Sequence, residues 1–385
     1  MKILHVITRL IQGGAQENTV ISCEAQSRNG HHVGLVYGPI YGPEGSLLNE
    51  AQQSGAKLFE LRWMQRAILP FHDLICYHSL RRIIRQFRPD IVHTHSSKAG
   101  IIGRAAAWSE KVPGIVHTVH GLPFHERQSS LVNFIYIHLE RWAARRCHII
   151  LGVTQKMCNA FALHNIANAM QMQVVPSGVR LADFCPSPDA RRSIRGSLNI
   201  PQDAPIVGLV ARLDKLKGQD DLLDVAKGLT EEFPGIRFLF VGDGWYRSAL
   251  EKRIDREGLK ECVIFTGLVP RRKVADYLAA MDINTLPSYQ EGQPRTLVQA
   301  LLCGCGIVGY QAGGIPEICI DGQTGLLAPV GDRKALQQAI ATLLRDANLR
   351  KRLTQNGVTH ARMQFDAEIM VQKLETIYQG VLAKP

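Results

Sequence analysis

Glu291 and Arg295 lie in a short polar stretch that runs into an apolar, helix-like segment in "SYQEGQPRTLVQA". The first backbone N–H groups of a helix attract anions, and a carboxylate just before them accepts hydrogen bonds instead. The stretch therefore combines an acceptor with a set of donor amides. This combination suits a ligand that needs both.

Two cations, Arg212 and Lys217, follow an apolar strand and precede a helix in "GLVARLDKLKGQDD". Ligands of open parallel sheets bind beyond the carboxyl ends of the strands. A guanidinium and an ammonium both suit phosphate oxygens. The position favours a diphosphate site over two solvated surface cations.

The first half of the chain offers two more candidate stretches. "TRLIQGGAQEN" places Gly13 and Gly14 between a strand and a helix, where glycine either makes a tight turn or lets backbone approach a phosphate or sugar. His120 ends a strand in "VHTVHGLPFHE" and can hydrogen-bond a hydroxyl or move a proton near neutral pH. His93 and His117 fit buried positions better. The spacing of these histidines follows strand alternation rather than a zinc pattern, so we expect no metal site.

Strand-like apolar runs alternate with helical periodicity along the whole chain, which predicts an α/β protein with parallel sheets covered on both faces. We expect two Rossmann-like domains, residues 1–182 and 183–365, that face each other across a cleft. Residues 183–193 have two prolines and no period and are predicted to be the linker. Residues 366–385 are predicted to form an amphipathic helix that packs back on the first domain. The predicted strands are 3–7, 32–37, 90–95, 114–120, 205–211, 236–242, 262–267, 282–287 and 306–310.

The composition is that of a globular protein, with 45% hydrophobic and 21% charged residues in a chain of 385. The opening "MKILHVI" resembles a strand rather than a signal peptide, and no apolar run approaches the about 18 residues of a membrane span. We therefore expect a cytoplasmic protein. The nine cysteines are odd in number and lack metal-type spacing, which indicates reduced, buried thiols.

The positive charge is concentrated in the first half. Residues 1–180 contain 19 Lys and Arg against 10 Asp and Glu, whereas the rest contains 26 against 24. An amphipathic segment at 77–90 fits either a core-facing helix with a solvated basic face or a helix that docks on the anionic inner face of the cell membrane. Nucleic acid fits less well because no recognition motif is present. The basic residues of the segment are Arg81, Arg82, Arg85 and Arg88.

Several motifs in order resemble those of the family 4 retaining glycosyltransferases, which have the GT-B fold, and the resemblance covers nearly the entire chain. It implies an enzyme that transfers a sugar from a nucleotide-sugar donor to a lipid-linked or glycan acceptor, such as a cell-surface polysaccharide, lipopolysaccharide or glycolipid precursor. It also implies that no metal or other cofactor is needed. The motifs are "GGAQE", "HTHSSKAGIIGRAAA", "HTVHGLPFHE", "ARLDKLKG", "FVGDG", "PSYQEGQPRTLVQALLCG", "AGGIPEI" and "GQTGLL".

The resemblance also implies roles for individual residues. Arg212 and Lys217 would neutralise the leaving diphosphate, Glu291 would contact the donor sugar, and His120 would lie at the reacting sugar. Preorganised cations at a departing diphosphate stabilise the transition state more than the ground state. The implied donor-binding residues are Gly13, Gly14, Gly242, Arg295, Thr296, Leu297 and Gln299.

Gln299 departs from the family pattern, because a second glutamate usually follows the first after seven residues and holds the ribose. An amide offers one acceptor and one donor group, so we expect this contact to weaken by about 1–2 kcal/mol. Two alternatives stay open: a UDP-sugar 2-epimerase-like enzyme, which needs no acceptor, and a non-catalytic sugar-nucleotide-binding subunit, which the change at Gln299 would fit. A dehydrogenase is disfavoured because the G-x-G-x-x-G pattern is missing.

Overall fold

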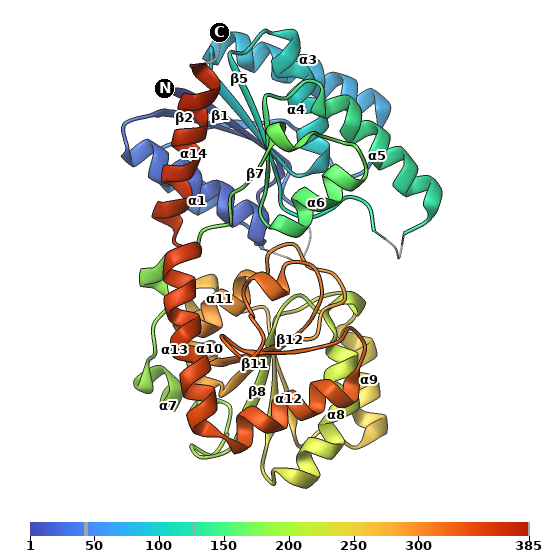
Figure 1. The fold of residues 1–385 in the computed structure, drawn as a ribbon, viewed down its shortest axis with the longest axis vertical. Helices are drawn as coiled ribbons and strands as arrows, with labels where there is room; N and C mark the ends of the chain where they lie inside the picture. The colour runs from blue at the N-terminus through green and yellow to red at the C-terminus, as the bar shows by residue number, and fades with distance from the viewer. Residues whose placement is uncertain (42–44, 126–127, 384–385) are drawn as a thin grey trace. The chain divides into compact units, whose positions relative to one another are not determined.

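The structure is a computed structural model that describes residues 1–41, 45–125 and 128–383. The chain divides into two compact units (Figure 1). The first contains Met1–Gly178 and Ala367–Pro385, and the second contains Val179–Asp366. The chain therefore passes from the first unit to the second after residue 178, whereas the sequence analysis placed this boundary after residue 182. It returns to the first unit after residue 366 rather than 365.

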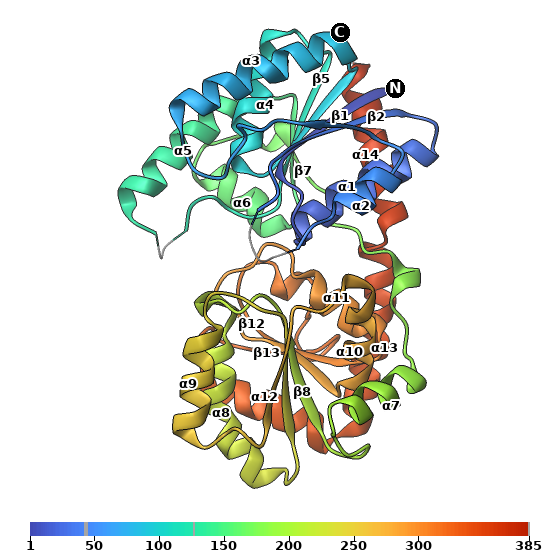
Figure 2. The same cartoon turned by 180° about the vertical axis from the view of Figure 1, so that it is seen from behind.

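Within the described residues, the first unit contains a parallel sheet of seven strands in the order β3-β2-β1-β4-β5-β6-β7 (Figures 1 and 2). Side chains alternate between the two faces of each strand. The strands are β1 (Lys2–Arg9), β2 (His32–Gly38), β3 (Lys57–Glu60), β4 (Ile91–His95), β5 (Gly114–Val119), β6 (Ile149–Gly152) and β7 (Met172–Val174).

Helices cover both faces of this sheet. Leu4 and Val6 pack with α3, α4 and α6 on one face, whereas Ile3 packs with α1 and α14 on the other. The helices are α1 (Gly14–Arg28), α2 (Leu48–Gln53), α3 (Pro70–Phe87), α4 (Ser97–Ser109), α5 (Ser130–Ala144), α6 (Gln155–Leu163) and α14 (Ala367–Leu382), with the 3-10 helix η1 (Ala169–Gln171).

The last helix, α14, packs beside α1 in the first unit (Figure 1). Its apolar stripe buries Met370, Val371, Leu374 and Tyr378. The side chains in this stripe follow the helical period, which is why the sequence alone indicated a helix with a surface to cover.

The second unit contains a parallel sheet of six strands in its described residues, in the order β10-β9-β8-β11-β12-β13. The strands are β8 (Ile206–Val210), β9 (Arg237–Val241), β10 (Val263–Gly267), β11 (Ile283–Leu286), β12 (Gly306–Tyr310) and β13 (Leu326–Ala328). The helices are α7 (Pro188–Ser197), α8 (Gln219–Glu232), α9 (Arg247–Glu257), α10 (Val274–Ala280), α11 (Arg295–Leu302), α12 (Arg333–Arg345) and α13 (Ala347–Gln364). The 3-10 helices are η2 (Leu181–Asp183), η3 (Lys215–Lys217), η4 (Arg271–Lys273) and η5 (Ile315–Glu317).

The predicted linker at 183–193 is wrong in part, because α7 begins at Pro188. Ser187 caps this helix by accepting a hydrogen bond from the Ala190 N–H, and proline is well suited to the first helical position. The two prolines therefore mark a helix start as well as a connection between the units.

All nine predicted strands are present, and the structure adds β3, β6, β7 and β13. The added strands have three or four residues each, which is too short to show a period of two in the sequence. The nine cysteines are free thiols, and all except Cys185 are buried.

Candidate functional site

The candidate site of the second unit lies at the carboxyl ends of β8 and β11. These strands are neighbours at the point where the strand order reverses, and such a switch point is the usual ligand position in an open α/β sheet. Arg212 and Lys217 follow β8, and Glu291 follows β11. The topology therefore brings three of the predicted residues to one edge of one sheet.

Hydrogen bonds join the loops after these two strands. The Ser288 hydroxyl and the Tyr289 N–H both donate to the Leu216 carbonyl, at 2.8 and 2.9 Å. Gly218 has a φ of 77°, and a Cβ there would lie 1.9 Å from the Pro287 carbonyl oxygen. Only glycine allows the loops to approach this closely.

Lys217 and Glu291 form an ion pair, with 2.7 Å between Nζ and Oε1. Their side chains are 25% and 9% exposed. The sequence analysis gave these residues separate roles, but the structure shows that they contact each other. The ion pair therefore holds the Glu291 carboxylate in place, and it puts one positive and one negative charge side by side at the switch point.

Arg212 is 46% exposed and pairs with Asp214 at 3.0 Å, so the two cations on this loop contact different carboxylates. Asp214 also accepts from the Trp245 indole N–H and the Leu216 N–H. Burial alone would raise the pKa of Asp214, but these hydrogen bonds and the charge of Arg212 outweigh it and lower that pKa. Asp214 was missed in the sequence analysis, although an acid two residues after an arginine was a visible signal.

The start of α11 carries the other predicted donor-binding residues. Pro294 is the N-cap residue and provides no side-chain cap for the first turn. Arg295 and Gln299 are 6% exposed, Leu297 is fully buried, and Thr296 is partly exposed. The guanidinium of Arg295 therefore belongs to the interior rather than to the surface.

Two glycines hold neighbouring loops close to the site. Gly242 follows β9 with a φ of 133°, and a Cβ there would lie 2.2 Å from the Ala211 carbonyl oxygen. Gly313 has a φ of 53°, and its Cβ would lie 2.0 Å from the carbonyl oxygen of Glu291. The position of Glu291 thus depends on glycine at 313.

Replacing Gly313 by alanine is expected to displace Glu291 and to destabilise the second unit. The loss should exceed the about 1–2 kcal/mol that a left-handed backbone costs a residue with a Cβ. Gly322→Ala is the matched control, because φ is 67° there and nothing lies within 4 Å of its Cβ. Urea unfolding would measure the free energy of unfolding of both variants, and equal losses would contradict the role of the close contact between Gly313 and Glu291.

In the first unit, Gly13 and Gly14 follow β1 and begin α1, with Gly13 as the N-cap residue. The φ of Gly13 is −168°, which any residue adopts, and its Cβ would meet the movable end of the Gln16 side chain at 2.6 Å. The backbone conformation therefore does not require glycine at 13. The small size of glycine and the family resemblance remain the reasons to predict a ligand loop there.

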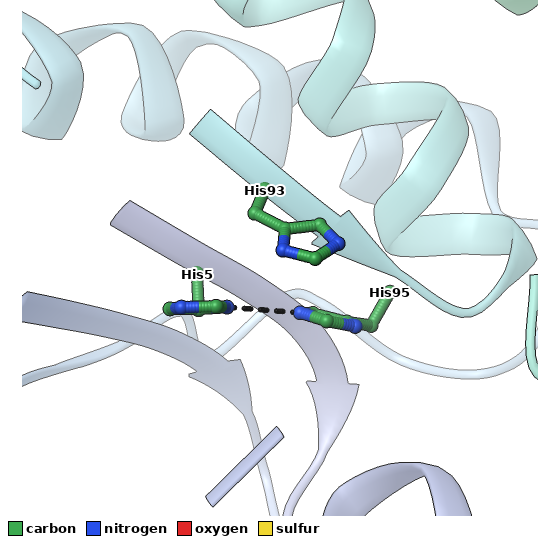
Figure 3. A group of neighbouring side chains, drawn as sticks. All are labelled: His5, His93 and His95. Carbon is green, nitrogen blue, oxygen red and sulfur yellow. Dashed lines mark hydrogen bonds between the residues drawn. The ribbon is translucent and has the colours of Figure 1, made fainter. Parts of the chain in front are cut away.

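His120 lies just beyond the carboxyl end of β5, as predicted, and its Nε2 is 3.1 Å from Nδ1 of His95. His93 and His117 are buried, which confirms the sequence interpretation. His5 was missed by the sequence analysis, although a histidine inside an apolar strand was a signal. Its Nδ1 lies 2.9 Å from Nε2 of His95 (Figure 3).

Ring nitrogens of His5, His93 and His95 lie within 4.8 Å of one another, so these three side chains are a group that could hold a metal ion (Figure 3). All three are buried. Burial lowers the pKa of His5 to about 4, and burial together with the neighbouring histidines lowers the pKa of His93 and His95. The rings are therefore neutral at pH 7.

Comparison with known proteins identifies two families along the chain. Residues 12–183 match Glycosyltransferase Family 4, and residues 190–360 match Glycosyl transferases group 1. The chain is 26% identical over 383 residues to UDP-Gal:alpha-D-GlcNAc-diphosphoundecaprenol alpha-1,3-galactosyltransferase of Escherichia coli, which covers 98% of this chain and 96% of the relative. It is 23% identical to the capsular polysaccharide biosynthesis glycosyltransferase CapM of Staphylococcus aureus, over 83% of this chain and 84% of CapM.

Solved structures share the fold. HepE of Anabaena, solved in complex with UDP and glucose, has a TM-score of 0.85 and 23% identity, over 99% of this chain and all of HepE. The two matched families meet near the boundary between the two units. The chain therefore belongs to the family 4 glycosyltransferases and is a glycosyltransferase with the GT-B fold.

Proposed function

We propose that this glycosyltransferase moves a sugar, with retention at the anomeric carbon, from a nucleoside-diphosphate sugar to a lipid-linked or polysaccharide precursor. The observation that carries the proposal is the Lys217–Glu291 pair beside Arg212 at the β8/β11 switch point. A sugar nucleotide has hydroxyls that need an acceptor and a diphosphate that needs cations. One edge of one sheet offers both.

The catalytic roles follow from charge. As the glycosidic bond breaks, negative charge builds on the diphosphate, and fixed cations at that position lower the barrier. Arg212 and Lys217 take this role, Glu291 accepts from sugar hydroxyls, and His120 contacts the reacting sugar by family likeness. The departing phosphate oxygen then takes the proton of the acceptor hydroxyl on the same face. By family likeness we also propose that no metal ion takes part.

The donor is proposed to bind also through Gly242, the first turn of α11 and Gln299, and through Gly13 and Gly14 in the first unit. Gln299 is nearly buried, so its amide replaces a carboxylate in a place with little water. The relatives support UDP as the nucleotide, since the Escherichia coli enzyme is named for UDP-Gal and HepE was solved with UDP. The Escherichia coli name also supports a diphosphate-linked lipid acceptor.

Product analysis tests this function. Purified protein is incubated with UDP-sugars, with and without a diphosphoundecaprenol-linked sugar acceptor, and with excess chelator in parallel. We expect a glycosylated lipid and UDP only when the acceptor is present, at a rate that the chelator does not change. An epimerase would form free product from donor alone. Binding of the donor without turnover in any arm would show a non-catalytic subunit.

We also propose that the first unit docks on the anionic face of a membrane. No helix among the described residues is both long enough and apolar enough to span a bilayer. The first two turns of α3 and α5 nevertheless expose large apolar side chains, with Phe71 83% and Phe134 58% exposed. Arg62 and Arg66 are exposed just before α3, whereas Arg81 and Arg85 are paired with Glu110 at 2.5 and 2.8 Å and contribute less.

Vesicle sedimentation measures this docking. The double variant Phe71→Ser/Phe134→Ser should bind vesicles of anionic phospholipid at least about tenfold more weakly, since burying each phenylalanine is worth roughly 1.5–3 kcal/mol. Met363→Ser, 62% exposed in the second unit, is the matched control and should bind as wild type does. Equal binding by wild type and the double variant would refute the proposed surface.

A further inference from the structure

A chain of hydrogen bonds runs through the first unit from α1 to the end of β5. Gln26 Oε1 lies 2.8 Å from His5 Nε2, and His5 Nδ1 lies 2.9 Å from His95 Nε2. His95 Nδ1 then lies 3.1 Å from His120 Nε2. The chain of hydrogen bonds therefore reaches His120, the histidine to which the proposed function gives contact with the reacting sugar.

Strand alternation explains why these side chains meet. β4 lies between β1 and β5, and His5 pairs in register with His93. His5, His93 and His95 lie on the face that α1 and α14 cover, where Ile3 and Ile91 also pack. Side chains from α1 and α14 complete the network on this face. The local sequence does not reveal this network, because its side chains come from five separate helices and strands.

The buried rings are neutral, so each has one N–H donor and one bare nitrogen that accepts. Gln26, His5 and His95 are at most 1% exposed, and the depressed pKa values of the two histidines agree with one proton per ring. A chain of such rings has a single direction. The choice of protonated nitrogen in the ring at one end of the chain therefore determines which nitrogen is protonated in the ring at the other end.

The direction follows from the Gln26 amide. Its Oε1 only accepts, so His5 donates from Nε2 and accepts at Nδ1. His95 must then donate from Nε2 to His5 and accept at Nδ1, and His120 must donate from Nε2 to His95. We propose that Gln26 is a positioning residue that, through His5 and His95, holds His120 in the Nε2–H tautomer. The effect of this tautomer on sugar transfer rests on the proposed function of His120.

A second branch agrees with this orientation of Gln26. Its Nε2 donates to the Tyr378 hydroxyl at 3.4 Å, which leaves the hydroxyl proton to bond Nδ1 of His93 at 2.6 Å. His93 then donates from Nε2 to Thr118 Oγ1 at 2.7 Å. One amide therefore orders both branches, and the C-terminal helix α14 takes part through Tyr378.

A metal ion in the His5–His93–His95 group is the rival arrangement. The His5 and His95 nitrogens are 2.9 Å apart, which fits a shared proton. Two nitrogens on one tetrahedral zinc would lie about 3.4 Å apart, given zinc–nitrogen distances of about 2.0–2.1 Å. Zinc would also break the bonds to Tyr378 or Thr118. The geometry favours the hydrogen-bonded chain.

Long-range ¹H–¹⁵N correlation spectra of the full chain with ¹⁵N-labelled histidine rings report each tautomer directly. The His120 signals are assigned by their loss in His120→Gln. The wild type should show His120 protonated at Nε2 and unprotonated at Nδ1. A wild-type His120 that carries its proton on Nδ1, or stoichiometric bound zinc by elemental analysis, would overturn the proposal without any variant.

Two substitutions test the role of Gln26. Gln26→Leu removes the acceptor, and because a buried N–H without a partner is costly, the chain should reverse and move the His120 proton to Nδ1. Gln26→Glu keeps an acceptor and should retain the wild-type tautomer. Thr94→Val is the matched control: it removes the 2.9 Å bond to His117, which lies outside the chain, and should leave His120 unchanged.

These spectra need neither donor nor acceptor, so they are independent of the proposed transferase chemistry. If His120 keeps its tautomer in folded Gln26→Leu, Gln26 does not set it and the proposal fails. Sugar transfer by Gln26→Leu should fall about tenfold, the effect of one lost hydrogen bond, and Gln26→Glu should restore it. If the His120 tautomer changes in Gln26→Leu but the rate of sugar transfer does not, the result would instead count against the role of His120 at the sugar.

Discussion

Lys217→Ala is expected to lower the turnover number for sugar transfer about 10²–10³-fold, as loss of one preorganised donor to transition-state charge does in other enzymes. The lysine is held by Glu291 at 2.7 Å and is only 25% exposed, so its charge acts where water is scarce. Because that charge matters most as the diphosphate departs, kcat should fall more than donor affinity. Single-turnover assays with the lipid-linked acceptor would measure it.

Two controls separate this role from simple support of Glu291. Lys215→Ala removes an exposed lysine from the same 3-10 helix, where it lies over the Tyr246 ring, and should leave turnover nearly unchanged. Glu291→Gln keeps the shape of the carboxylate partner. If Lys217 served only to hold Glu291, the double variant would be no worse than either single variant. Undiminished turnover by Lys217→Ala would remove the lysine from the mechanism.

Glu140→Ala is expected to lower the free energy of unfolding of the first unit by about 3–5 kcal/mol, because it leaves a buried charge unpaired. Arg104 on α4 donates to Glu140 on α5 at 2.6 Å, and both side chains are at most 1% exposed. The guanidinium also donates to the Gly100 carbonyl at 2.8 Å, so it cannot turn out to water without breaking α4 contacts. Hydrogen exchange of α4 and β5 amides in rising urea would measure the loss.

The matched control is an exposed pair in the same unit. Glu368→Ala breaks the ion pair between Glu368 and Arg28 and should change the free energy of unfolding little. The side chain of Arg28 is 59% exposed and that of Glu368 is 57% exposed. The double variant Arg104→Met/Glu140→Leu replaces the buried pair by apolar side chains and should recover most of the loss. A Glu140→Ala protein as stable as Glu368→Ala would show that the buried charge is compensated elsewhere.

The sequence placed the strands well where the signal is local. Strands of five or more residues have a visible apolar run, and all of those in the described residues were found. Arg212 and His120 follow such strands, so their place at the carboxyl edge could be predicted from parallel topology alone. The linker failed at Pro188 because the Ser187 cap and a proline at the first helical position look like a turn in sequence.

By itself the sequence determined that this chain has two α/β units, a returning C-terminal helix and a set of residues suited to a sugar nucleotide. Only the tertiary structure decided which of these residues touch. Lys217 and Glu291 are 74 residues apart and His5 and His95 are 90 apart, and each pair meets because two parallel strands lie side by side. Local sequence reports which face a side chain takes, but not which strand becomes its neighbour.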